Sequence, residues 1–140
     1  MLRDGKFVGF TSVIGDLLHP GHAAMLMECK RYCDYLIVVV VDSTDGRKSE
    51  AVQSLFERCY SVKQNKFVDE VYCAQDEKDL ELSIKLLAPI IDVRFVGQDY
   101  EGKDYTGKAF CESYGINIVY NKRLHGLSST ELKERIRCQK

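Results

Sequence analysis

The chain has 140 residues, of which 45% are apolar and 29% charged, and its formal net charge is −1. This composition is typical of a globular domain with a substantial core, and the charge provides no general attraction to nucleic acid. The longest fully apolar run, Leu36 to Val41, is too short to cross a bilayer, and the first residues lack the apolar segment of a signal peptide. We therefore expect one cytoplasmic domain, residues 1–140, that binds neither nucleic acid nor membranes.

The first two predicted elements are a buried strand over residues 7–14 and a helix over residues 20–32. The run His19-Pro20-Gly21-His22 stands where this helix begins. Proline suits the first helical turn because its missing N–H would have no partner there, and glycine lets a ligand approach the backbone. Since helix N-termini attract anions, two histidines at this position predict a phosphate-handling site.

The rest of the chain alternates between strand and helix patterns. Strands are expected at 36–41, 70–73, 93–96 and 116–120, and helices at 50–65, 78–88, 104–114 and 129–138. The run from Leu36 to Val41 is apolar throughout, as in a strand that is covered on both faces. This alternation favours an α/β fold in which a parallel sheet carries helices on both faces.

Polar segments follow the predicted strands and mark the expected binding crevice. They cover residues 15–22, 42–49 and 97–103, and a further segment, 122–130, leads into the last helix. Ligands of open parallel sheets bind at the carboxyl ends of the strands, so these segments are expected to converge. The six cysteines include no Cys-x-x-Cys pair, and we expect reduced thiols and no metal site.

Two motifs give the chain a resemblance to a known family. Asp16 to His22 resembles the His-x-Gly-His signature of the cytidylyltransferase-like nucleotidyltransferases, and Gly126 to Lys133 resembles their second signature, a Ser/Thr-rich turn that opens the last helix. Gly97 to Gly102 matches a Gly-x-Asp-aromatic motif. The resemblance covers nearly the whole chain and is greatest to bacterial glycerol-3-phosphate cytidylyltransferases. It implies a Rossmann-like, five-stranded parallel sheet and a homodimer.

The resemblance also implies a reaction. A phosphorylated acceptor, a small polyol such as glycerol 3-phosphate, attacks the α-phosphorus of CTP and releases pyrophosphate, with Mg²⁺ bound to the triphosphate. An adenylyltransferase that uses ATP and a sugar phosphate, as in ADP-heptose synthesis, is the alternative within the same chemistry. Ile14, Gly15 and Leu124 depart from the family pattern and remove two hydroxyl groups. A catalytically weakened, nucleotide-binding relative is therefore a further alternative.

The resemblance assigns catalytic roles to four residues. His19 and His22 would donate hydrogen bonds to the phosphates, Arg123 would neutralise the β- and γ-phosphates, and Lys48 would supply a second cation. Arg47 competes with Lys48 and is a candidate for acceptor binding. The predicted nucleotide-binding residues are Ile14, Gly15, Asp16, Pro20, Gly21, Asp99, Gly126, Leu127, Ser128, Ser129 and Thr130. The Ser/Thr run also reads as a simple helix N-cap.

Overall fold

A five-stranded sheet forms the centre of the computed structural model, which describes residues 5–43, 50–122 and 128–139. Its strands are β1 (Val8–Val13), β2 (Tyr35–Val41), β3 (Glu70–Ala74), β4 (Val93–Gly97) and β5 (Asn117–Asn121). The order is β3-β2-β1-β4-β5, and every neighbouring pair is parallel. The predicted parallel sheet is therefore confirmed.

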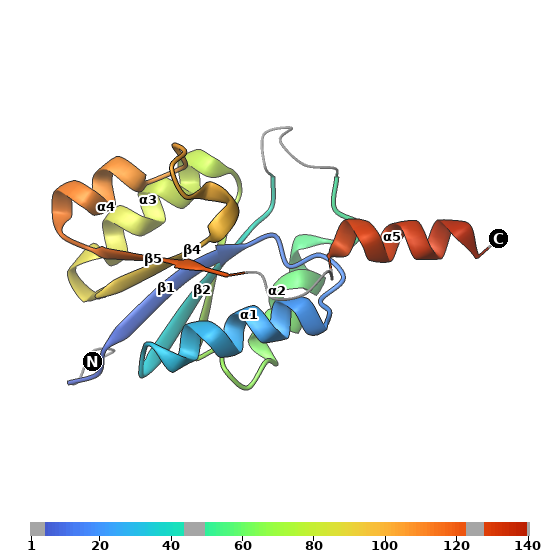
Figure 1. Ribbon diagram of the computed structural model, residues 1–140, viewed down its shortest axis with the longest axis horizontal. Coiled ribbons are helices and arrows are strands. Elements are labelled where there is room, and N and C mark those ends of the chain that lie inside the picture. Colours follow the sequence, from blue (N-terminus) through green and yellow to red (C-terminus); the bar gives the residue numbers. More distant parts are fainter. Residues whose placement is uncertain (1–4, 44–49, 123–127, 140) are drawn as a thin grey trace.

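Helices cover both faces of the sheet (Figure 1). On one face lie α1 (Pro20–Arg31) and α2 (Leu55–Lys63), and on the other α3 (Glu77–Leu87) and α4 (Lys108–Tyr114). The last helix, α5 (Ser129–Cys138), projects away from the sheet, and η1 (Ala88–Ile90) and η2 (Gln98–Tyr100) are short 3₁₀ turns. This is the expected Rossmann-like architecture. Within the described ranges, no helix is long and apolar enough to cross a membrane.

Strand β2 shows why the central apolar run is continuous. Ile37 and Val39 pack into the cluster beneath α3 and α4, whereas Leu36 and Val38 pack into the cluster beneath α1 and α2. Successive side chains of a strand point to opposite faces, so a strand that is covered on both sides must be apolar at every position.

Two helices begin later than the sequence pattern predicts. The helix expected from residue 50 begins at Leu55, because Ser54 and Glu57 form a capping box in which each side chain accepts a hydrogen bond from the other's backbone N–H. The helix expected from residue 104 begins at Lys108, because Gly107 adopts the left-handed conformation with φ +78°.

The sheet opens between β1 and β4, the point at which the strand order reverses. Strand β1 pairs with β2 along its whole length but with β4 only as far as the Phe10–Arg94 pair. Beyond that pair, the Thr11 hydroxyl donates to the Phe95 carbonyl at 3.1 Å and replaces the backbone ladder. The two strands then diverge and leave a crevice at their carboxyl ends, where ligands of such sheets bind.

Candidate active site

A cavity of about 970 Å³ occupies this crevice. A pocket of this size suits a small-molecule ligand. Its wall includes residues of β1, β4, α1, η2 and the N-terminal half of α5. Ten of the predicted site residues line it: Ile14, Gly15, Asp16, His19, Gly21, His22, Asp99, Ser128, Ser129 and Thr130. The fold therefore brings together residues that are more than a hundred positions apart in the sequence.

The other predicted site residues are not part of the described lining. Pro20 is the first residue of α1 and is exposed on its surface. Arg47, Lys48, Arg123, Gly126 and Leu127 lie outside the described residues. The roles expected of all the predicted site residues, including the ten that line the cavity, stay predictions.

The two histidines form a reciprocal cap at the start of α1. Nδ1 of His19 accepts a hydrogen bond from the Gly21 N–H at 3.0 Å, and Nδ1 of His22 accepts one from the His19 N–H at 3.2 Å. A neutral imidazole that accepts at Nδ1 carries its proton on Nε2. The ring centroids are 4.0 Å apart, so the two imidazoles lie next to each other at the N-terminus of α1. This arrangement suits the binding of phosphate oxygens.

Asp16 connects the turn after β1 to two other segments. Its carboxylate accepts hydrogen bonds of 2.9 Å from the backbone N–H groups of Val52 and Gln53 and lies 3.0 Å from the Lys133 ammonium. The Ser129 hydroxyl donates to the Asp16 carbonyl oxygen. Asp16 is only 3% exposed, so these contacts hold the N-termini of α1 and α5 next to each other. Through these contacts, Asp16 and Ser129 fix the positions of the two helix N-termini at the cavity.

The ionisation of Asp16 should make the stability of the protein depend on pH. Burial alone would raise the pKa of Asp16 above its ordinary value of 3.8, but the N–H groups of Gln53 and Val52 and the Lys133 ammonium outweigh burial and lower this pKa. Because the pKa is lower in the folded state, ionised Asp16 stabilises the fold above pH 3.8, and this contribution is lost as the pH falls through the folded pKa.

We therefore expect Asp16→Asn to lower the free energy of unfolding at pH 7, with a smaller difference from the parent protein below pH 3.8. Urea denaturation of both proteins across this range measures the difference. The exposed Asp104→Asn substitution is the control and should change stability little at either pH. A deficit of the Asp16 variant that stays constant with pH would contradict this prediction.

Arg58 is a buried cation that the sequence analysis did not single out. Its guanidinium donates to the carbonyl oxygens of Ile14, Val41 and Gln53 at 3.1, 2.9 and 3.1 Å and forms an ion pair with Asp42. Arg58 is only 1% exposed. It therefore joins the carboxyl ends of β1 and β2 to the segment before α2. Arg58 stands four residues before the apolar Val62 of α2, and this helical spacing was the signal in the sequence that Arg58 faces inward.

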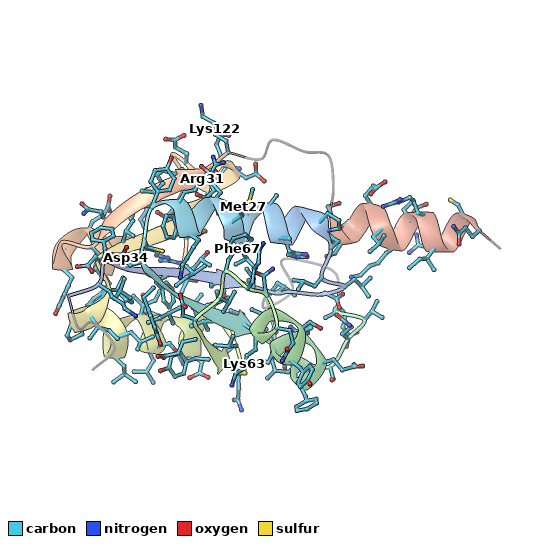
Figure 2. The ribbon with its side chains drawn as sticks, turned by 90° about the horizontal axis from the view of Figure 1, so that it is seen from below. Met27, Arg31, Asp34, Lys63, Phe67 and Lys122 are labelled. Atoms are coloured by element: carbon cyan, nitrogen blue, oxygen red, sulfur yellow. The ribbon has the colours of Figure 1, made fainter. Side chains whose placement is uncertain are left out.

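Further cations lie on the α1 side of the cavity. Arg31, in the last turn of α1, and Lys122, just after β5, both line it, as does Met27 one turn before Arg31 (Figure 2). Neither Arg31 nor Lys122 belongs to a motif that the sequence analysis used. Glu28 of α1 also lines the cavity and forms an ion pair with Arg31 at 3.6 Å, so this rim carries charges of both signs.

A family model for cytidylyltransferase-like proteins matches residues 16–135. The chain belongs to the cytidylyltransferase-like family. Glycerol-3-phosphate cytidylyltransferase of Bacillus subtilis is 36% identical over 126 residues, which cover 86% of this chain and 90% of that protein. The family assignment confirms the resemblance found in the two sequence motifs.

Two further comparisons show similarity over different shares of the proteins compared. The bifunctional protein HldE of Gluconacetobacter diazotrophicus is 34% identical over 96% of this chain, but the match covers only 28% of HldE. The chain thus spans little more than a quarter of that relative. The crystal structure of a lipopolysaccharide core biosynthesis protein from Thermoplasma volcanium GSS1 superposes with a TM-score of 0.65 at 23% identity, covering 85% of this chain and 97% of that one. This similarity supports the fold.

Proposed function

We propose that this cytidylyltransferase-like chain transfers CMP from CTP to a small phosphorylated polyol such as glycerol 3-phosphate. The single observation that carries the proposal is the reciprocal His19–His22 cap at a cavity that the start of α5 also lines. Two helix N-termini that face one cavity suit a triphosphate better than a ligand with one anionic group. The similarity to glycerol-3-phosphate cytidylyltransferase over 90% of that relative supports the choice of base and acceptor.

The proposed reaction needs stabilisation of charge more than covalent catalysis. An oxygen of the acceptor phosphate forms a bond to the α-phosphorus of CTP, the bond from this phosphorus to the α,β-bridging oxygen breaks, and pyrophosphate leaves with the electron pair. Because the attacking phosphate is already an anion, no strong general base is required. The Nε2–H groups of His19 and His22 would stabilise the negative charge that develops on the bridging oxygen.

Magnesium would neutralise part of the triphosphate charge. Within the described part of the chain, no cluster of three His, Cys, Asp or Glu side chains could hold a metal ion. We expect the ion to be held mainly by the oxygens of the nucleotide, as is common for Mg²⁺. The homodimer implied by the resemblance and the cytoplasmic location expected from the lack of long apolar segments remain predictions.

A screen of pyrophosphate release tests the proposal directly. Four nucleoside triphosphates are crossed with glycerol 3-phosphate, a heptose phosphate and a no-acceptor control, in the presence of Mg²⁺. We expect release with CTP and glycerol 3-phosphate together and little release when either is omitted. Release with ATP in preference to CTP would contradict the proposed nucleotide, and release with no combination would favour a relative that has lost turnover.

The second candidate function is adenylyl transfer to a sugar phosphate. The observation that favours it is the 34% identity to HldE over 96% of this chain. Titration calorimetry with CTP and ATP separates the two candidates before any acceptor is known. Tighter binding of ATP would support this second function, and tighter binding of CTP would support the first.

A further inference from the structure

Arg94 is a buried cation at the floor of the crevice. It interrupts an otherwise apolar strand, β4, and is 4% exposed. Arg94 belongs to the last residue pair between β1 and β4, so its position is the point from which the two strands diverge. Its side chain points to the α3 and α4 face of the sheet, where it contacts Cys111 of α4, and it lines the same cavity as His19 and His22.

The surroundings of Arg94 satisfy only part of its guanidinium group. Nη1 donates to the Thr106 carbonyl oxygen at 2.6 Å, and the guanidinium carbon lies 5.2 Å from the centre of the Tyr105 ring. Nε is buried and has no hydrogen-bond partner among the described residues. In that part of the chain, no ion pair joins Arg94 to a carboxylate.

The backbone opposite Arg94 leaves room for the guanidinium. Gly107 adopts φ +78°, and a Cβ atom there would lie 2.9 Å from Nη1 of Arg94 and 2.7 Å from Cδ1 of Ile84. The same turn directs the carbonyl group of Thr106 towards Nη1. The segment before α4 is thus shaped around a cation that faces the cavity.

A buried charge without a counter-ion is costly, and an apolar side chain at this position would avoid that cost. An anionic ligand in the cavity would supply the missing charge and accept the remaining N–H donors, because guanidinium groups bind phosphate with several hydrogen bonds at once. The histidine cap lies on α1, which covers the opposite face of the sheet from α3 and α4. The triphosphate and the ligand of Arg94 would therefore approach the crevice from different sides.

We propose that Arg94 binds the phosphate group of the acceptor and selects for phosphorylated acceptors. This inference rests on the proposed function, since it assigns the second substrate of that reaction to the side of the crevice formed by Arg94, Tyr105 and Thr106. The nucleotide occupies the side formed by the N-termini of α1 and α5. Arg94 positions the attacking oxygen and restricts the acceptors to those that carry a phosphate.

The test compares Arg94→Met, which keeps the length of the side chain without its charge, with Arg94→Lys and with the exposed Arg137→Met as a matched control. Steady-state rates of pyrophosphate release are measured with CTP and glycerol 3-phosphate. For Arg94→Met we expect the KM for glycerol 3-phosphate to rise roughly 10- to 100-fold, while the KM for CTP stays close to that of the parent. Arg94→Lys should recover part of the loss, and Arg137→Met should show none.

Binding measured without turnover separates this inference from the proposed function. Titration calorimetry should show that glycerol 3-phosphate binds the parent protein and Arg137→Met but not Arg94→Met, and that glycerol binds none of them. These results would support the inference even if no acceptor gave pyrophosphate release, an outcome that would count against the proposed function alone. Equal binding of glycerol 3-phosphate by Arg94→Met and the parent would overturn the inference about Arg94. A selective loss of CTP binding by Arg94→Met would overturn it as well.

Thermal unfolding distinguishes a binding residue from a structural one. Without ligand, we expect Arg94→Met to have a Tm equal to or above that of the parent, because the substitution removes an uncompensated buried charge. Added glycerol 3-phosphate should raise the Tm of the parent and leave that of Arg94→Met unchanged. A large fall in Tm for Arg94→Met, with an unchanged KM for the acceptor, would show that Arg94 serves the fold.

Discussion

Replacing His22 with alanine is expected to lower the rate of pyrophosphate release by about 10²- to 10³-fold, the loss that follows removal of one donor to a developing charge. Nε2–H of His22 would bind the oxygen on which negative charge accumulates as the bond to pyrophosphate breaks. The interaction is stronger in the transition state than in the bound substrate, so kcat should fall more than CTP binding. Stopped-time measurements of pyrophosphate at saturating CTP and acceptor give the rate.

The same histidine also caps α1, so two further variants are needed to separate catalysis from folding. His22→Asn places an amide near the position of Nδ1, where it can still accept from the His19 N–H, but it has no donor at Nε2. His22→Gln extends an amide donor towards the Nε2 position. We expect the asparagine variant to unfold at nearly the parent temperature and to be as inactive as the alanine variant.

The glutamine variant should retain more activity than either of the other two. If all three variants lost activity in proportion to their loss of thermal stability, the histidine would serve the helix cap and not the reaction. That result would contradict the catalytic role of His22. Titration of CTP into each variant provides the accompanying measure of an intact nucleotide site.

The fold and the location of the site could be predicted because both depend on local patterns. The unbroken apolar run from Leu36 to Val41 predicts a strand that is covered on both faces, and β2 is such a strand. Parallel strands bring their carboxyl ends to one edge, so the segments that contain His19 and Ser128 could be expected to converge, and both residues line the cavity. The start of α2 was predicted at residue 50, too early, although Ser54 and Glu57 have the spacing of a capping box that marks the observed start at Leu55.

The contacts that position the site could not be predicted in this way. Asp16 is bound by Gln53, 37 residues later, and by Lys133 of the last helix, and no periodicity connects these positions. Arg94 appeared in the sequence as a charge within a strand, but its lack of a carboxylate partner depends on the packing of α3 and α4. Long-range polar contacts of this kind can be identified only from the tertiary structure, because one sequence pattern is compatible with many pairings of polar groups.

Replacing Arg58 with methionine is expected to destabilise the protein by about 3–5 kcal/mol. Methionine fills most of the volume but donates no hydrogen bond, so the carbonyl groups of Ile14, Val41 and Gln53 lose their contacts with the guanidinium. Buried carbonyls without partners are costly, at about 1–3 kcal/mol each. The ion pair with Asp42 adds less, because the Asp42 side chain is 49% exposed and screened by water. Urea denaturation followed by circular dichroism measures the loss.

Two companion variants show whether the carbonyl contacts carry this stability. Arg58→Lys keeps the charge but cannot donate from three nitrogens at once, so its stability should lie between those of the parent and Arg58→Met. Arg135→Met, on the exposed face of α5, makes the same chemical change and should cost less than about 0.5 kcal/mol. Ile14 lies in the turn that leads to His19, so loss of the Arg58 contact should also loosen the histidine cap. The kcat of the molecules that remain folded should therefore fall. An Arg58→Met protein as stable and as active as the parent would show that the carboxyl ends of β1 and β2 hold their positions without this guanidinium.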